Sequence, residues 1–309
     1  MVLNYTVATN DINIRLSNIL KNKLHISNRL LIKLKNGKCI FVNDKICNVD
    51  YIVNENDKIQ VKLDNIYNNN IKTFNYPLHN FKLDILFEDE YLLIVNKPAF
   101  MPVHPCSNNI DKTLLNAIYN YYNDRKYINC TAHIITRLDS NTSGICFIAK
   151  NSYIQELFIT LKDKINFKKS YIALVNNIIK VNHNFIINNI SRDENSIITR
   201  KVTNDINIGK YAKTEYTVTR RNYNLNYTEV IVTLHTGRTH QIRVHFASLG
   251  HTLLGDELYA NIYDKSYSKE CKRYINRHAL HCSLISFIHP ITNELIDITC
   301  NVPKDFNID

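Results

Sequence analysis

The polar segment from residue 137 to residue 144, Arg-Leu-Asp-Ser-Asn-Thr-Ser-Gly, holds the first side chains that could do chemistry. An apolar run lies on each side of it, which is the pattern of two strands joined by a turn. Arg137 and Asp139 stand two residues apart, at the rim of what must be a buried strand. The Asp139 carboxylate could hold the turn by accepting backbone N–H bonds, pair with an arginine, or act as a nucleophile or base. Turn holding is the commonest use of a loop aspartate, so residue type alone leaves these uses open.

A second polar segment, residues 236–245, reads Thr-Gly-Arg-Thr-His-Gln-Ile-Arg-Val-His. Apolar residues at helical spacing overlap and follow it, and Gly250 predicts the end of that helix. On such a helix Arg243 can reach inward, where its permanent charge and its fork of donors suit a carboxylate. Arg238 and His240 would lie at the start of the helix, near phosphate groups of a bound polyanion.

Composition predicts a globular protein with a polyanionic partner. The chain has 309 residues, is 45% hydrophobic and carries a formal net charge of +10 with a sequence pI near 9.1. Nucleic acid is the first candidate for such a partner and an anionic membrane surface the second, while solubility alone is the plain alternative. No apolar run is long enough to span a bilayer, and the N-terminus lacks the build of a signal peptide. We therefore expect no membrane association.

The cysteines and histidines predict neither a disulfide framework nor a metal site. The eight cysteines contain no C-x-x-C pair, and several lie in apolar runs, as expected of a reduced cytoplasmic protein. Among the twelve histidines, His278 and His281 are three residues apart, and His240 and His245 are five apart. No carboxylate or cysteine completes a recognisable ligand set beside either pair. Scattered polar or RNA-facing histidines are the better interpretation.

Residues 1–66 predict a small separate domain. Helical spacing indicates two short helices, the second capped by Ser27 and ended by Gly37, followed by a strand, a turn and a strand. Residues 15–38 contain basic side chains and no acidic one, which suits contacts with phosphates, although a solvated helix face is the usual meaning of a charge run. The Asn-rich stretch 67–80 predicts a linker.

Residues 81–309 predict a larger domain in which strands dominate. Strands are expected on both sides of the acidic turn near residue 89, and an antiparallel hairpin is expected over 212–234. Further elements are predicted as helices at 113–122 and 153–161 and a strand at 168–175. Residues 184–209 look polar and irregular, without a functional interpretation.

Several motifs, taken in chain order, resemble those of the ribosomal large-subunit pseudouridine synthase A (RluA) family. They are Arg-Leu-Asp with Thr-Ser-Gly at 137–144, Lys-x-Tyr-x-Ala-Leu-Val at 169–175, Gly-Arg-x-His-Gln-Ile-Arg at 237–243, and Arg-His-Ala-Leu-His at 277–281. Residues 89–105 are similar to the opening segment of the catalytic domain in this family. Two departures are visible, since the family usually has histidine in place of Thr136 and a basic residue in place of Ser140.

The resemblance implies a role for each matched side chain. Asp139 would be the catalytic aspartate and Arg243 its basic partner, while Tyr171 would stack on the target base and could serve in proton transfer. Leu280 would form an apolar wall of the base pocket. Substrate binding or support of the site would fall to Arg137, Arg238, His240, Gln241 and Arg277. The chemistry of the family uses a carboxylate, with no metal and no cofactor.

The resemblance also implies an α+β pseudouridine synthase fold, a mostly antiparallel mixed sheet with flanking helices and a central cleft. The first 66 residues resemble the small S4 RNA-binding domain, an α/β unit that commonly precedes RluA-type catalytic domains. The expected protein is a cytoplasmic monomer that isomerises particular uridines of large-subunit ribosomal RNA or transfer RNA. A flipped base and an ionised Asp139 would be required.

Two other functions compete with this expectation. A non-catalytic RNA-binding protein that kept the fold would explain the departures at Thr136 and Ser140, but it would not explain an intact Asp139, Tyr171 and Arg243. An aspartyl phosphotransferase would need a second carboxylate two residues after the first, and the chain has Asn141 there.

Overall fold

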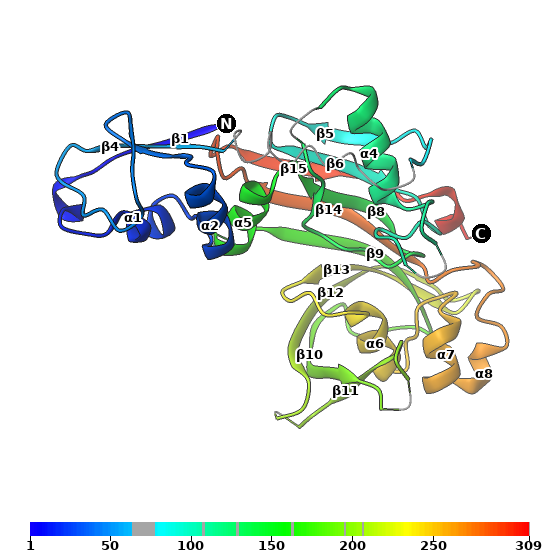
Figure 1. Cartoon of the computed structure of the whole chain (residues 1–309). Coiled ribbons are helices and arrows are strands. Elements are labelled where there is room, and N and C mark those ends of the chain that lie inside the picture. The colour runs from blue at the N-terminus through cyan, green and yellow to red at the C-terminus, as the bar shows by residue number, and fades with distance from the viewer. Residues whose placement is uncertain are drawn as a thin grey trace.

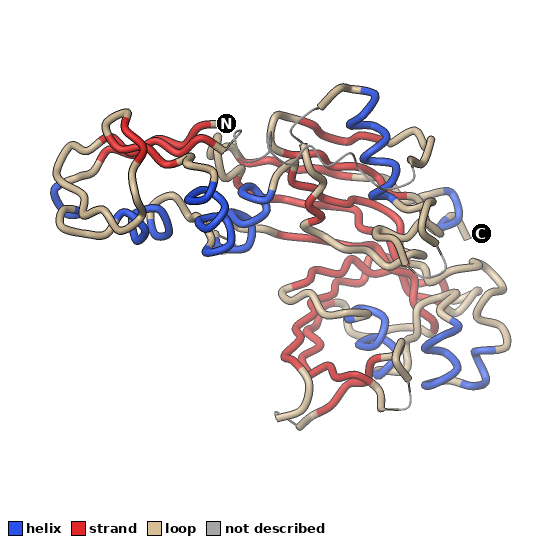
Figure 2. The backbone as a smooth tube through the Cα atoms, in the orientation of Figure 1, coloured by secondary structure: helices blue, strands red, loops and turns tan. Residues whose placement is uncertain are grey.

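The structure of the protein is a computed structural model that describes residues 1–63, 78–106, 109–127, 130–161, 164–194, 196–205 and 207–308. Its described strands form a 4-stranded sheet near the N-terminus and an 11-stranded sheet in the rest of the chain (Figure 1). Figure 2 shows strands through both units, with helices beside them and one helix, α6 in Figure 1, inside the curve of the lower strands. Most of the predicted linker, 67–77, lies outside the described residues, and 78–80 form neither helix nor strand. Within the described ranges no helix is long and apolar enough to cross a membrane.

The N-terminal unit contains a sheet in the order β1-β4-β2-β3 and two helices. Its elements are β1 (Val2–Thr6), α1 (Leu16–Asn22), α2 (Asn28–Asn36), β2 (Ile40–Val42), β3 (Lys45–Ile46) and β4 (Lys58–Lys62). Ser27 caps α2 as predicted, since its hydroxyl accepts a hydrogen bond from the amide of Leu30 at 3.3 Å. Gly37 ends the helix at a φ of −79°, so it is not the left-handed cap that its residue type suggested.

The large sheet runs in the order β11-β10-β12-β13-β9-β14-β8-β6-β5, with β15 paired to β14 and β7 paired to β8. Its strands are β5 (Asp84–Glu88), β6 (Leu92–Lys97), β7 (His133–Ile134), β8 (Ser143–Ala149), β9 (Lys168–Asn176), β10 (His183–Arg192), β11 (Arg200–Thr203), β12 (Lys210–Asn222), β13 (Tyr227–Leu234), β14 (Leu280–Ile288) and β15 (Leu295–Thr299). The pair β14–β8 is parallel, and the other strand pairs of this sheet among the described residues are antiparallel. The predicted mixed, mostly antiparallel sheet is therefore confirmed, whereas the central cleft remains a prediction.

The core forms where β8 passes through the middle of the sheet. Every residue of β8 is buried, because the strand has neighbours on both sides and apolar residues at nearly every position. Phe147 of this strand packs against Phe158 and Phe287, with ring centroids 4.8 and 4.9 Å apart. The contacts anchor the strand from which the loop with Asp139 extends.

Helices lie beside both halves of the large sheet, the first half from β5 to β14 and the second half from β9 to β11 in the spatial order. They are α4 (Leu114–Asp124) and α5 (Ser152–Thr160) in the first half, and α6 (Gln241–Ser248), α7 (Glu257–Tyr263) and α8 (Lys265–Ser268) in the second half (Figure 1). The helix predicted at 113–122 begins with a capping box in which the Thr113 side chain accepts from the amide of Asn116. The hairpin predicted over 212–234 is formed by β12 and β13.

The prediction for residues 184–209 was wrong, because β10 and β11 lie there. Ile186 and Ile190 face the interior, but Phe185 and Ile187 on the other face are 41% and 51% exposed. Apolar residues on both faces remove the alternation that marks a half-buried strand, and the asparagines between them resemble a loop.

Gly144 allows the parallel contact between β8 and β14. Its φ is +106°, and a Cβ built there would lie 2.3 Å from the carbonyl oxygen of Cys282. We expect Gly144→Ala to lower the free energy of unfolding strongly, since it adds a backbone clash to a left-handed conformation. Gly250→Ala is the matched control, because Gly250 has a φ of +77° and no atom within 4 Å of a built Cβ.

Chemical denaturation would compare the two variants. Gly250→Ala should cost about 1–2 kcal/mol for the left-handed backbone alone. Gly144→Ala should cost at least about 2 kcal/mol more because of the added overlap. Equal costs for the two variants would contradict the close approach of the strands.

Candidate active site

The loop between β7 and β8 places Asp139 at the margin of the large sheet. The amide of Thr142 donates to the carbonyl of Asp139 at 3.1 Å, which closes the turn just before β8. The carboxylate itself faces a cation rather than the turn, and 31% of the side chain is exposed. Asp139 is thus anchored by its backbone and accessible by its side chain.

Arg243 binds Asp139 and a second carboxylate at once. Its Nη1 donates to Oδ2 of Asp139 at 3.1 Å, while Nε and Nη2 donate to the two oxygens of Asp256 at 2.7 and 2.8 Å. The side chain of Arg243 is only 7% exposed and that of Asp256 only 1%. Burial alone would lower the pKa of Arg243, but Asp256 and Asp139 together raise it above its usual value. The pairing of Arg243 with Asp139 expected from the resemblance is present in the structure.

His240 lies beside the same carboxylate. Its Nε2 is 3.6 Å from Oδ2 of Asp139, and its Nδ1 is 3.1 Å from the hydroxyl of Tyr259. Burial, followed by the charge of Arg243, lowers the pKa of His240, so the ring is neutral at pH 7. The residue caps α6 in the left-handed conformation, with a φ of 56°. It therefore lies beside Asp139 at the start of α6, and its expected contact with phosphates remains a prediction.

Gln241 and Arg238 differ in what they can offer a substrate. Gln241 is buried, and its amide is used within the protein: Oε1 accepts from the Arg238 amide at 2.9 Å, and Nε2 donates to the Thr214 hydroxyl at 2.9 Å. It therefore holds the turn before α6. Arg238 is exposed, and its Nε donates to the carbonyl of Tyr211 at 2.9 Å. Its remaining donors can reach solvent or a ligand.

Sheet register brings Tyr171 and Leu280 to neighbouring strands. Tyr171 on β9 pairs with Cys282 on β14, and Leu280 at the start of β14 pairs with Ala173. Both side chains are buried, at 4% and 5% exposed. Burial, followed by the nearby Cys282, raises the pKa of Tyr171 well above its usual value. The phenol thus stays protonated at neutral pH, so it can donate a hydrogen bond but does not start as a base.

Two buried cations lie beneath the loop. Lys97 is fully buried, and its Nζ donates to the carbonyls of Pro98, Met101 and Ser140 at 2.7, 2.9 and 3.0 Å. Burial lowers its pKa to about 8. Arg277 is 1% exposed and donates to the carbonyl of Asn141 at 3.0 Å. The position of Arg277 suits support of the loop, because protein acceptors surround its guanidinium.

The histidines of the last motif are buried, so of the two interpretations left open by the sequence they fit polar side chains within the protein rather than RNA-facing ones. His278 is buried with its Nε2 2.8 Å from the hydroxyl of Thr142, and His281 is buried with its Nδ1 3.0 Å from the hydroxyl of Ser143. Both therefore fix side chains where the loop that carries Asp139 enters β8. In the described part of the chain, no group of three or more His, Cys, Asp or Glu side chains is arranged to hold a metal ion.

With this geometry in place, known proteins supply the context. Residues 91–248 match the model of the RNA pseudouridylate synthase family. The chain belongs to this family. As an RNA pseudouridine synthase of the RluA type it is an isomerase, which the resemblance predicted.

Similar proteins support this membership along most of the chain. The chain is 33% identical to an RNA pseudouridine synthase of Bacillus subtilis, described as uncharacterized, over 92% of its own length and 94% of that protein's. It is 36% identical to ribosomal large subunit pseudouridine synthase D of Haemophilus ducreyi, over 74% and 69% of the two lengths. Human RNA pseudouridylate synthase domain containing 1 shares the fold, with a TM-score of 0.57 at 23% identity over 72% of this chain and 84% of that one.

Lys97 and Asp256 had no role assigned from the sequence. Both lie inside segments that resemble the family, Lys97 in the opening segment and Asp256 in the pair Gly255-Asp256 that follows the Gly-Arg-x-His-Gln-Ile-Arg motif. A lysine inside an otherwise apolar strand and an aspartate after a glycine were the available signals. Neither shows which distant residue such a side chain will contact.

Asp256 orients Arg243 toward Asp139, so its charge matters to the synthase. We expect Asp256→Asn to lower kcat by about 100-fold, because the guanidinium loses a two-point partner and can rotate away from Asp139. Affinity for RNA should stay near that of the wild type. Steady-state turnover and filter binding would measure the two quantities.

Glu257→Gln is the matched control for Asp256→Asn. Glu257 follows Asp256 but forms an exposed ion pair with Lys272. Its loss should change kcat by no more than about two-fold, since exposed pairs contribute little. Similar losses in the two variants would show that general helix damage, and not the orientation of Arg243, limits turnover.

Proposed function

We propose that this pseudouridine synthase converts a particular uridine of large-subunit ribosomal RNA to pseudouridine, with Asp139 as the catalytic carboxylate. The observation that carries the proposal is the pair Asp139–Arg243, in which a partly exposed carboxylate faces a buried and doubly anchored guanidinium. The relatives named ribosomal large subunit pseudouridine synthase D support ribosomal RNA over transfer RNA as the substrate class.

The reaction breaks the bond between N1 of uracil and C1′ of ribose and joins C5 of the same uracil to C1′. C5 loses its proton and N1 gains one, so the atoms of the nucleoside are conserved. The base must turn between the two steps, which requires that it leave the helical stack and enter a pocket. An ionised carboxylate can promote cleavage by attack on C1′ or by removal of a sugar proton that yields a glycal.

Arg243 keeps Asp139 ready for either route. The guanidinium donates a charge-assisted hydrogen bond of 3.1 Å to the carboxylate, which orients one of its oxygens. Because Asp256 occupies Nε and Nη2 of Arg243, Nη1 remains directed at Asp139. The neutral ring of His240 adds a polar neighbour at 3.6 Å without a second positive charge.

The residues around this pair supply contacts for the base and for the backbone. Tyr171 and Leu280, on adjacent strands, would flank the flipped uracil as a stacking ring and an apolar wall. Arg137 and Arg238 are exposed on the two loops that border the site, where guanidinium groups suit phosphates. Arg277 and Gln241 would act through the loops that they hold rather than by touching RNA.

The departures from the family pattern do not reach the ion pair. Thr136 is buried, and its hydroxyl accepts from the amide of Phe147 at 3.0 Å, so it stabilises the start of the loop. Ser140 offers its carbonyl to Lys97. Catalysis is thus favoured over the alternative of an RNA-binding protein without activity.

Removal of the carboxylate tests the proposal. We expect Asp139→Asn to abolish turnover while affinity for RNA stays within a few-fold of the wild-type value, because the amide keeps the shape but cannot act as a nucleophile or base. RNA labelled with tritium at uracil C5, from cells that lack the protein, would report turnover as tritium released to water. Ribosomal and transfer RNA would be assayed separately.

Each outcome of this assay has a distinct meaning. Release from ribosomal RNA by the wild type alone would support both the activity and the role of Asp139, and mapping of the product would name the uridine. Release from transfer RNA alone would overturn the substrate class. Tight RNA binding without release from either RNA would favour the non-catalytic alternative.

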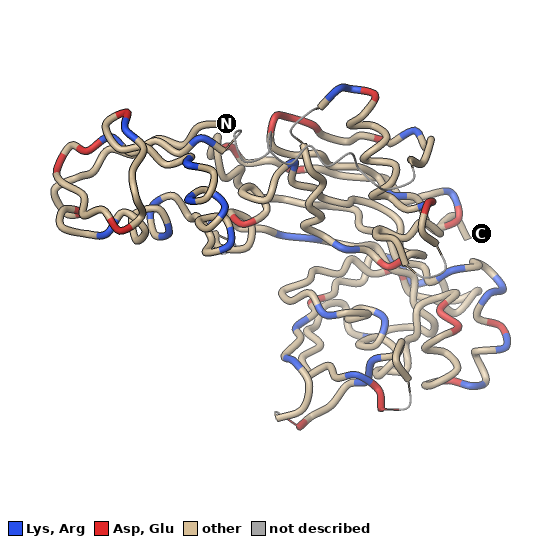
Figure 3. The backbone as a smooth tube through the Cα atoms, in the orientation of Figure 1, with Lys and Arg blue, Asp and Glu red and all other residues tan. Residues whose placement is uncertain are grey.

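We further propose that residues 1–66 form an S4-like RNA-binding domain, joined by a linker at 67–80 to the catalytic domain at 81–309. Two helices on a small sheet support this assignment, as do the exposed basic residues of α2, Arg29, Lys33 and Lys35 (Figure 3). A hydrogen bond of 3.1 Å from the Tyr153 hydroxyl to the Leu24 carbonyl joins the two units. A second RNA contact tethered in this way would raise affinity without new chemistry.

Replacement of Arg29, Lys33 and Lys35 by glutamine should weaken RNA binding on the order of 10-fold at physiological salt and lower the salt dependence of binding by about three ions. The kcat at saturating RNA should not change. Salt titrations of the dissociation constant would measure the effect.

The control replaces Lys45, Lys58 and Lys62, on the strands of the same unit, by glutamine. The change in net charge is identical, and a melting temperature would account for the contact that Lys62 makes with the ring of Phe41, 4.4 Å from its Nζ. Equal weakening in both variants would indicate general attraction to RNA and would count against a binding face on α2.

Localisation and assembly complete the proposal. The synthase would act in the cytoplasm, as a monomer and without a metal or cofactor, where its ribosomal RNA substrate is assembled. All eight cysteines are free thiols, which fits a reducing compartment.

A further inference from the structure

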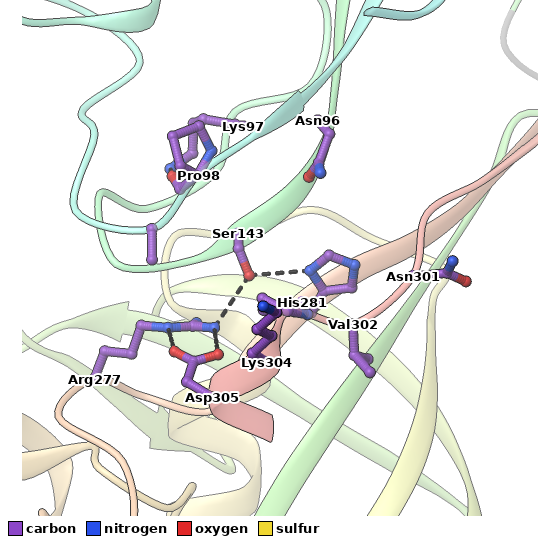
Figure 4. A pocket seen from close by; sticks show the side chains of 12 residues that line it. Asn96, Lys97, Pro98, Ser143, Arg277, His281, Asn301, Val302, Lys304 and Asp305 are labelled. Carbon is purple, nitrogen blue, oxygen red and sulfur yellow. Dashed lines mark hydrogen bonds and ion pairs between the residues drawn. The ribbon is translucent and has the colours of Figure 1, made fainter. Parts of the chain in front are cut away.

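Arg277 joins three parts of the chain beneath the catalytic loop. Its Nη1 donates to the carbonyl of Asn141 in the loop at 3.0 Å and to that of Leu280 at the start of β14 at 3.3 Å. Its Nη2 donates to the hydroxyl of Ser143 at 3.2 Å. Its Nε and Nη2 donate to the two carboxylate oxygens of Asp305 at 2.7 and 3.0 Å (Figure 4).

Asp305 belongs to a segment that packs on the core independently of this ion pair. It lies in the 3₁₀ turn η2 (Lys304–Phe306), and the ring of Phe306 is buried 5.2 Å from the guanidinium carbon of Arg277. Two residues later, the carbonyl of Ile308 accepts from the hydroxyl of Tyr227 at 3.3 Å. Residues 302–308 thus form a latch, a segment that holds Asp305 in place from both sides.

We propose that Asp305 is a positioning residue for catalysis, which sets the loop of Asp139 through Arg277. The guanidinium of Arg277 is 1% exposed, whereas the Asp305 side chain is 42% exposed. A buried guanidinium without its carboxylate would turn toward water or toward other acceptors. The carbonyl of Asn141 and the hydroxyl of Ser143 would then lose their donor, and the loop would loosen.

The path from this contact to the carboxylate is short. Asn141 lies two residues after Asp139, and the amide of Thr142 between Asn141 and Ser143 closes the turn on the Asp139 carbonyl. A small shift of the turn changes the approach of Asp139 to the sugar, and misplacement by about 1 Å can cost about 100-fold in rate. RNA would not touch Arg277, so affinity should not follow the rate.

Substitution of Asp305 tests the latch, with the full chain. We expect Asp305→Asn to lower kcat by about 10- to 100-fold, with KM and the RNA dissociation constant within about two-fold of wild type. Asp305→Glu, which restores the charge, should recover much of the lost kcat. Hydrogen exchange of a peptide spanning 137–145 should become at least about ten-fold faster in Asp305→Asn.

Asp264→Asn is the control for general damage. Asp264 caps the short helix α8, where it accepts from the amide of Tyr267 at 3.0 Å, and its described contacts lie away from the loop. Its loss should leave kcat and the exchange of 137–145 unchanged. A reduced melting temperature in both variants, with slow turnover only in Asp305→Asn, would support the latch.

The turnover test of the latch rests on the proposed function, whereas the hydrogen-exchange test does not. Wild-type turnover with an equally active Asp305→Asn protein would overturn the latch and leave the proposed function intact. A rise in KM at unchanged kcat would also overturn it, because Asp305 would then serve binding. Absence of turnover in the wild type would count against the proposed function, and unchanged exchange of 137–145 in Asp305→Asn would still reject the latch.

Discussion

A guanidinium held between two carboxylates controls the geometry of this site. Arg243 is buried, and one of its partners, Asp256, is buried with it, so that pair is desolvated and anchored at two points. Asp139 takes the remaining donor and keeps contact with solvent. The carboxylate proposed to perform the chemistry is thereby separate from the carboxylate that provides rigidity, although both bind the same arginine.

Support for the loop comes from backbone carbonyls as much as from side chains. Lys97 and Arg277 lie under successive peptide groups, at Ser140 and Asn141, and each donates to other carbonyls nearby. These hydrogen bonds fix the backbone immediately after Asp139, and a site that must be held precisely needs such rigid support. The two cations and the histidines beneath the loop therefore belong to the scaffold of the active site, although none of them is expected to touch RNA.

Much of this arrangement could be predicted from the sequence. Periodicity located the capped helices and the β12–β13 hairpin, and the motifs around Asp139 and Arg243 indicated the partners of the ion pair. The sequence could not show that Asp256 would accept hydrogen bonds from both Nε and Nη2 of Arg243, because spacing along a chain does not encode which distant groups meet. Gln241 and Arg277 were expected to bind substrate or support the site, and their burial follows from tertiary packing that residue type alone does not reveal. The strand β10 was not predicted, because both of its faces carry isoleucine or phenylalanine and the alternation of a half-buried strand is absent.

The contact between the loop and the segment around Arg277 joins residues that are 136 positions apart in the chain. Parallel pairing of β8 with β14 is equally non-local, since it aligns Gly144 with Cys282. Such contacts form late, because the entropy of closing a long loop must be overcome before they contribute any stability. A chain still under synthesis would hold Asp139 without the neighbours that orient it. Catalytic competence should consequently appear only at the last stage of folding, together with the cooperative closure of the sheet.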